Sequence, residues 1–181
     1  MRSLFIFLIF LAWPVVLHAD ESFDEIDFGA GFVSVEAGKA MVLGSGQHVV
    51  TDPVLLYVLI GLNLRKEFGF SGESDSWISA FKLGGGGGTE RATGKAELFY
   101  DLLVKIRYTF FSRGVSLRPY LEAGPGLIKY VSGAFELEGG GGLNFHFGSG
   151  FAGAGVQYKR LFKSDSFTAA LGYFGELGYQ F

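Results

Sequence analysis

One segment, residues 96–108, constrains the fold of this chain more than any other. Its even-numbered residues read Ala-Leu-Tyr-Leu-Val-Ile-Tyr, whereas the intervening positions include Glu97, Asp101, Lys105 and Arg107. Because successive side chains of a β-strand point to opposite faces, this period of two predicts a strand with one apolar and one charged face. An apolar face that carries aromatic residues toward its ends and is backed by charges is typical of a strand in a transmembrane barrel.

The last segment of the chain, residues 167–181, shows the same alternation. One face, broken only at Gly175, carries Phe167, Ala169, Leu171, Tyr173, Leu177, Tyr179 and Phe181. Polar residues and glycines occupy most of the other face, and Phe174 is the exception. The apolar run 53–62 would cover only about half a bilayer as a helix, whereas roughly 9 to 11 residues suffice for a tilted strand. These segments predict an all-β protein, an eight-stranded antiparallel transmembrane β-barrel.

The N-terminus predicts export. Arg2 precedes an apolar run over residues 4–17, and the small residue Ala19 precedes the acidic pair Asp20-Glu21. The run is shorter than the roughly 20 residues of a membrane-spanning helix, so we expect a secretory signal peptide over 1–19 and one barrel domain over 20–181. Loss of Arg2 leaves 14 basic residues against 18 acidic ones, a net charge of 14 − 18 = −4. Without a basic cluster, nucleic acid is excluded as a partner.

The alternation predicts eight strands, at residues 27–37, 53–65, 77–83, 95–110, 115–130, 134–147, 151–161 and 167–181. With both termini in the periplasm, the outer loops fall at 38–52, 84–94, 131–133 and 162–166. The run Gly84–Gly88 is therefore expected in a flexible loop, because it lacks the sequence context of a phosphate-binding motif. A hairpin turn at Ser149-Gly150 is expected, and a bulge at Pro125, since proline donates no ladder hydrogen bond.

A second glycine run, residues 139–142, lies inside a predicted strand. With the turn at Ser149-Gly150, inward-facing Gly142 would lie opposite Gln157 and inward-facing Gly140 opposite Lys159. Glycine in a strand leaves space for a neighbouring group, so we expect these two positions to make room for the Gln157 and Lys159 side chains. Gly139 and Gly141 would leave a shallow hollow on the lipid side, near Ala123 and Ala154.

Three segments of the second half resemble a known family. They are Leu117-Arg-Pro-Tyr-Leu-Glu-Ala-Gly-Pro-Gly-Leu127, Gly153-Ala-Gly-Val-Gln-Tyr158 and Gly175-Glu-Leu-Gly-Tyr-Gln-Phe181. They look like the small outer-membrane β-barrel superfamily of OmpA/OmpX type, and the resemblance covers residues 95–181. It implies an outer-membrane location in a Gram-negative bacterium and an assembly signal, at Tyr179 and Phe181, that the barrel-assembly machinery reads.

The pattern Arg118-Pro-Tyr-Leu-Glu-Ala-Gly124 also resembles the lipid A 3-O-deacylases, which carry a His-x-Ser pair on the seventh strand. In this chain the matching positions are Gln157 and Lys159. Glutamine has no titratable proton and protonated lysine is no nucleophile, so the catalytic pair is missing. His146 with Glu136 or Glu138 is the remaining candidate for such chemistry. We therefore expect no catalytic, cofactor or metal site.

Charged and polar residues are predicted to face the lumen. They are Lys105, Arg107, Arg118, Glu122, Glu136, Glu138, His146, Gln157, Lys159 and Glu176. An eight-stranded barrel is just wide enough for side chains to fill it, so an internal salt-bridge network is favoured over a conducting pore. The sequence thus predicts a monomer among lipopolysaccharide and phospholipid, without enzymatic activity, in an envelope-structural or surface-interaction role. A lipid-A-directed acyl hydrolase and a narrow channel stay open as alternatives.

Overall fold

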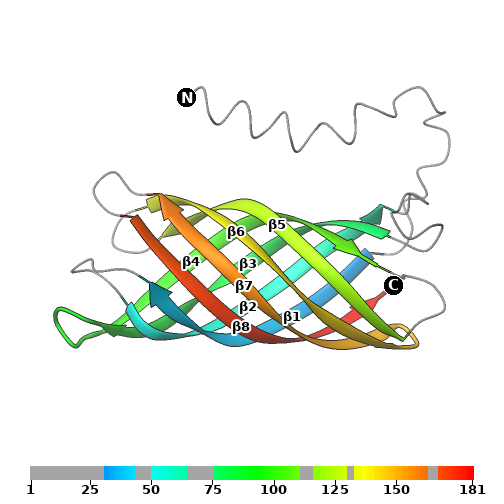
Figure 1. Cartoon of the computed structure of the whole chain (residues 1–181), viewed down its shortest axis with the longest axis horizontal. Coiled ribbons are helices and arrows are strands. Elements are labelled where there is room, and N and C mark those ends of the chain that lie inside the picture. Colours follow the sequence, from blue (N-terminus) through cyan, green and yellow to red (C-terminus); the bar gives the residue numbers. More distant parts are fainter. Residues whose placement is uncertain (1–30, 44–49, 65–75, 111–115, 130–132, 163–166) are drawn as a thin grey trace, which may run out of the picture.

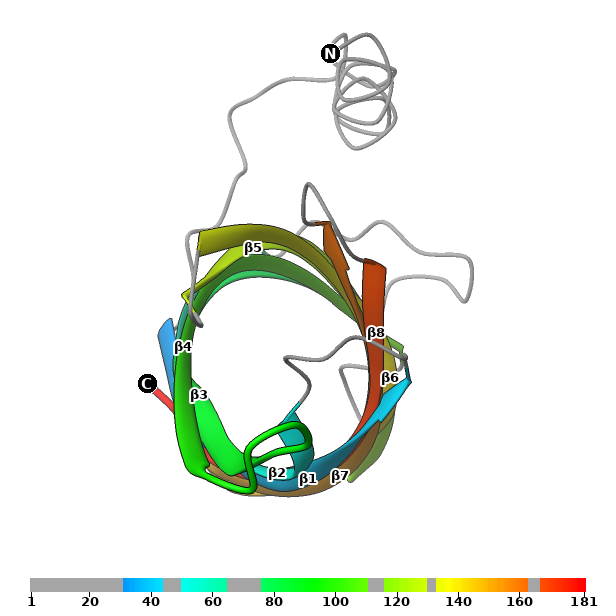
Figure 2. The same ribbon diagram turned by 90° about the vertical axis from the view of Figure 1, so that its left-hand side faces the viewer.

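The computed structural model describes residues 31–43, 50–64, 76–110, 116–129, 133–162 and 167–181. These residues form eight antiparallel strands that close into one barrel in sequence order (Figure 1). The strands are β1 (Gly31–Leu43), β2 (Val50–Leu64), β3 (Ser76–Glu90), β4 (Ala96–Thr109), β5 (Leu117–Lys129), β6 (Gly133–Phe147), β7 (Gly150–Phe162) and β8 (Phe167–Gln180). Viewed along the barrel, they form a closed ring (Figure 2). The predicted fold class is confirmed.

Pairing of β1 with β8 closes the barrel and brings the start of the first strand beside the end of the last. The backbone N–H of Phe181 donates to the carbonyl oxygen of Gly31 at 2.9 Å. We call this the terminal end and the opposite one the distal end (Figure 1). The predicted signal peptide, residues 1–19, lies outside the described residues. Within those residues no helix is long and apolar enough to cross a membrane.

The two predictions of long distal loops are wrong. β1 continues to Leu43 and β2 begins at Val50, so most of residues 38–52 is strand. β3 continues to Glu90, and Gly84–Gly88 pairs with β2 on one side and with β4 on the other. A ladder needs only backbone groups, so glycines extend it when the neighbouring strands supply the side chains.

The hairpin between β6 and β7 also differs from the prediction. Phe147 pairs with Gly150, so the turn residues are Gly148 and Ser149 rather than Ser149 and Gly150. Gly148 has a φ of 62°, which glycine adopts without steric cost. The register moves accordingly: Gly142 lies opposite Gly155 and Gly140 opposite Gln157.

The expected bulge at Pro125 is absent. Leu103 pairs with Gly126 and Ile106 with Ala123 in one register, so the β4–β5 ladder passes Pro125 without an inserted residue. A register shift occurs instead between Thr51 and Val54 in β2. Asp52 in this interval has a φ of 48° and precedes Pro53. The two prolines thus differ: the ladder keeps its register at Pro125, whereas the register shifts in the interval that contains Pro53.

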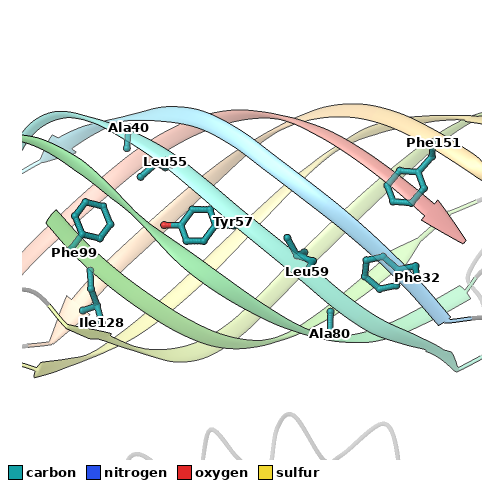
Figure 3. Packing of buried hydrophobic residues seen from close by; sticks show 9 residues of the cluster. All are labelled: Phe32, Ala40, Leu55, Tyr57, Leu59, Ala80, Phe99, Ile128 and Phe151. Atoms are coloured by element: carbon teal, nitrogen blue, oxygen red, sulfur yellow. The ribbon is translucent and has the colours of Figure 1, made fainter.

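The apolar residues of the lumen gather in two layers. Phe32, Leu59, Ala80 and Phe151 lie toward the terminal end, whereas Ala40, Leu55, Phe99 and Ile128 lie toward the distal end (Figure 3). Tyr57 lies between the two layers.

The outer wall is apolar along all eight strands, and its exposed side chains include Leu98 at 66% and Leu177 at 67%. Apolar outside and charged inside is the arrangement of a transmembrane barrel.

Candidate functional site in the barrel lumen

Between the two apolar layers the lumen holds a cluster of ten charged side chains, each at most 7% exposed. They are Glu36, Lys82, Asp101, Lys105, Arg107, Glu122, Glu136, Glu138, Lys159 and Glu176. Each occupies an inward position of the alternation that its own strand shows. Because a buried charge is costly without a partner, their contacts decide whether this cluster is stable.

Arg107 in β4 organises the part of the cluster nearest the terminal end. Its Nη1 lies 2.9 Å from Oε2 and 3.0 Å from Oε1 of Glu176, and its Nη2 lies 2.9 Å from Oε2 of Glu122. The guanidinium carbon lies 4.2 Å from the centroid of the Tyr120 ring, and Ser34 donates to Glu176 at 2.7 Å. The planar guanidinium therefore joins β4 to β5 and β8 with paired hydrogen bonds.

Two lysines continue the cluster toward its middle. Lys105 Nζ lies 2.6 Å from Oε1 of Glu138 and also donates to Glu122. Lys82 Nζ lies 2.6 Å from Oε2 of Glu36 and 2.9 Å from Oε1 of Glu138. Glu138 thus accepts from both lysines, which joins β3, β4 and β6 through one carboxylate.

Lys159 completes the cluster toward the distal end. It pairs with Asp101, and its Nζ lies 3.2 Å from Oε2 of Glu136 and 3.4 Å from Oε2 of Glu138. Tyr57 donates to Oδ2 of Asp101 at 2.9 Å, so β2 also joins the network. With Lys82 donating to Gln157 at 2.9 Å, every one of the eight strands contributes a side chain.

Inward glycines make room for large side chains on neighbouring strands. A Cβ on Gly142 would lie 2.8 Å from the Tyr120 hydroxyl oxygen, and one on Gly155, directly opposite, would lie 2.7 Å from it. In the same way the Phe151 ring occupies the space beside Gly178, and Tyr57 lies against Gly84. The glycines do make room for larger groups, but with other partners than predicted: Gly142 accommodates Tyr120 rather than Gln157, and Gly140 lies against Gln157 rather than Lys159.

Lys105, Arg107, Glu122, Glu136, Glu138, Gln157, Lys159 and Glu176 all lie in the buried network. Arg118 and His146 are half-buried on the inward faces of their strands nearer the terminal end. The His146 ring stacks on Phe151 with the centroids 5.3 Å apart. Phe181 and Tyr179 are exposed on the outer wall of the terminal end, at 68% and 53%.

Sequence reasoning did not include Glu36, Tyr57, Lys82 and Asp101 in the network. Two signals could have found some of them. Asp101 shares the charged face of its strand with Lys105, and Glu36 continues the alternation Val33-Ser34-Val35. Nothing in the sequence places Lys82 beside Glu138, because β3 and β6 meet only across the closed lumen.

The structure does not bring together the predicted candidate for acyl hydrolase chemistry, His146 with Glu136 or Glu138. His146 lies eight residues from Glu138 on the same strand. Because a strand rises about 3.3 Å per residue, the two residues are roughly 26 Å apart along β6. Gln157 and Lys159 face the lumen at 3% and 7% exposure. Among the described residues, no group of three or more His, Asp or Glu side chains is arranged to hold a metal ion.

No family model matches the chain, and no curated protein matches its sequence. Solved structures that share its fold include the following three. Neisserial surface protein A (NspA) is 14% identical with a TM-score of 0.59, and the match covers 84% of this chain and 99% of that one. Ail, the attachment invasion locus protein of Yersinia pestis, is 17% identical with a TM-score of 0.53, over 84% and 99% of the two chains.

The third solved structure is the outer membrane enzyme PagL, 18% identical with a TM-score of 0.50 over 82% of this chain and 98% of that one. All three alignments cover nearly the whole of the other chain, so the likeness extends over a complete barrel. The predicted resemblance to small outer-membrane barrels is confirmed at the level of fold.

Proposed function

We propose that this protein is an integral barrel of the Gram-negative outer membrane with an envelope-structural or surface-interaction role. Its lumen is closed by side chains, and the terminal end faces the periplasm. The observation that carries the proposal is the buried network, in which side chains of all eight strands meet. A lumen filled in this way joins the strands and leaves no route for a solute.

The two apolar layers support a closed lumen. Phe32 and Phe151 are 2% and 4% exposed toward the terminal end, and Leu55 and Phe99 are 5% and 9% exposed toward the distal end. An ion would have to displace both layers and break the ion pairs between them. We therefore expect no conductance in planar bilayers, and steady single-channel currents would favour the narrow channel instead.

The alternative of a lipid-A-directed acyl hydrolase has the fold of PagL in its favour. Against it, the two positions that match the deacylase pair are buried in the lumen, where a membrane lipid cannot reach them. Mass spectrometry of lipid A from cells with and without the protein tests this alternative. We expect identical acyl chains, and loss of one chain only in cells with the protein would contradict our assignment.

Short distal connections favour the envelope-structural role. The strand ends leave six residues between β1 and β2, five between β3 and β4, three between β5 and β6, and four between β7 and β8. Long extracellular loops are the usual variable part of such barrels. With connections this short, the wall contacts far more lipid than the distal end can offer to a protein partner.

The location is tested by fractionation. A barrel inserted through the barrel-assembly machinery should appear with outer membranes and migrate faster on gels when it is not heated. We expect a monomer surrounded by lipopolysaccharide and phospholipid. Recovery in the soluble periplasm, without a heat-modifiable band, would overturn the proposal.

A further inference from the structure

Exposed cations on the outer wall lie toward one end of the barrel. Lys39 in β1, Lys129 in β5 and Arg160 in β7 face outward in the distal half of their strands. In the terminal half of the strands, the outward side chains that the structure describes carry no charge. Exposed aromatic residues such as Phe147, Tyr179 and Phe181 are found there instead. The wall thus has one electropositive edge, at the end away from the termini.

The cations are also unevenly distributed around the barrel. All three lie on the side formed by β5 to β8 and β1, whereas the one described outward charge on β2, β3 and β4 is Asp52. Arg91 and Lys95 lie beyond the strands, in the connection between β3 and β4. An anionic ligand in the membrane would therefore meet a favourable surface on one side of the wall only.

Lys39 and Arg160 flank β8 and form opposite corners of one patch. Lys39 pairs with Tyr173, Met41 with Leu171, Leu171 with Tyr158, and Arg160 with Ala169. The patch consists of Lys39, Met41, Tyr158, Arg160, Leu171 and Tyr173. Tyrosines beside basic residues are typical of the level where lipid headgroups begin.

Below this patch the wall has small side chains. Gly175 pairs with Ala37 on one side and with Ala154 on the other, directly beneath the row that contains Lys39 and Tyr173. A Cβ on Gly175 would meet only the carbonyl oxygen of Gly153, at 3.8 Å. The wall therefore recedes beneath Lys39 and Tyr173, where acyl chains of a ligand would pack.

We propose that this patch binds a phosphorylated glycolipid of the outer leaflet, with its phosphates at Lys39 and Arg160 and its acyl chains over Ala37, Ala154 and Gly175. The inference rests on the proposed outer-membrane location, because that location places the distal end in the leaflet that contains lipopolysaccharide. Two cations separated by a strand suit a headgroup with more than one phosphate better than a phospholipid with one.

The test compares two charge-matched double variants. Lys39→Gln/Arg160→Gln removes the patch cations, and Arg91→Gln/Lys95→Gln removes two cations from the other side of the same end. Each folded barrel, in neutral detergent, is titrated with bis-phosphorylated lipid A and measured by native mass spectrometry. Basic residues near a membrane surface contribute enough that we expect affinity to fall roughly tenfold or more in the first variant and little in the second.

Two further titrations use the wild-type barrel and so do not depend on how the variants fold. Lipid A from which the phosphates have been removed should bind as weakly as intact lipid A binds the first variant. Phosphatidylglycerol should compete poorly at equal phosphate concentration. Equal losses in the two variants, unchanged binding of dephosphorylated lipid A, or full competition by phosphatidylglycerol would each overturn the inference.

Failure of this inference is distinct from failure of the proposed function. A barrel that fractionates with outer membranes but shows no preference for the phosphorylated glycolipid would contradict the patch alone. A barrel absent from outer membranes would contradict the location on which both depend.

Discussion

Basic side chains occur on both surfaces of the barrel wall, but they are buried on the inner surface and exposed on the outer one. Inside, Lys82 and Lys105 are 0% and 1% exposed, and each pairs with two glutamates. Outside, Lys39 and Lys129 are exposed on the distal half of an apolar wall. A buried cation depends on every carboxylate around it, whereas an exposed one can change its partner without cost to the fold.

This difference indicates at which positions a substitution should lower the stability of the barrel most. The inner surface is a single packed unit in which charges, aromatic rings and glycines each depend on neighbouring strands. The outer surface meets lipid, and its side-chain contacts are local, as where the Arg160 guanidinium lies 5.6 Å from the centroid of the Phe162 ring. Matched substitutions on the two surfaces should therefore differ in their effect on stability, and three pairs test this, while a fourth pair compares two positions of the outer surface.

The largest effect is expected from Lys105→Met. The variant leaves Glu122 and Glu138 without their shared cation. Removing one partner of a buried pair typically costs about 3 to 5 kcal/mol, so we expect that loss in the free energy of unfolding. Urea unfolding of the barrel from lipid vesicles measures it. Lys129→Met, on the outer wall, should change stability by less than about 0.5 kcal/mol.

Arg107→Lys should have the next largest effect. The charge is kept, but an ammonium group cannot pair with Glu122 and Glu176 as the planar guanidinium does. Loss of a hydrogen bond to a charged group costs roughly 1.5 to 3 kcal/mol. Arg160→Lys is the control on the outer wall. The same urea unfolding experiment applies, and comparable stability of the two variants would show that charge alone, without geometry, maintains the network.

The glycine positions provide a third pair. Gly142→Leu places a side chain where the Tyr120 hydroxyl lies, and overpacking typically costs about 1 to 3 kcal/mol. Gly139→Leu faces lipid, where a Cβ would meet only the Glu122 carbonyl oxygen, at 3.9 Å. We expect this second variant to unfold at nearly the wild-type urea concentration. A greater loss at Gly139 would mean that the faces of β6 are reversed.

The smallest effect on stability is expected from Phe181→Asp. Charges near the edge of the apolar wall cost only about 0 to 1 kcal/mol, so refolding into vesicles should be nearly normal. In cells we expect a much larger loss of heat-modifiable barrel, because the resemblance places Phe181 in the assembly signal. Phe147→Asp, also exposed at the terminal end, is the control. Equal cellular yields of the two variants would remove that role from Phe181.

The sequence predicts the fold well because alternation is a local property. Most outward side chains of residues 96–108 and 169–181 can be assigned without any knowledge of their neighbours, although Tyr108 and Ala169, which the alternation also places outside, are buried. The prediction failed at Gly84–Gly88, since glycine itself carries no alternation. Their place in β3 depends on Tyr57 and Phe99, which come from β2 and β4 and fill the space beside them.

Sequence alone determined the partition of this protein into an apolar outside and a charged inside, because each strand shows that partition through its own period of two. Only the tertiary structure decided which inward groups meet. The Gly148 conformation sets β7 against β6 so that Lys159 lies opposite Glu138. Closure of β8 onto β1 then brings Glu36, Lys82 and Arg107 into one network. These contacts join strands far apart in the chain, so they depend on register and closure, which no local pattern specifies.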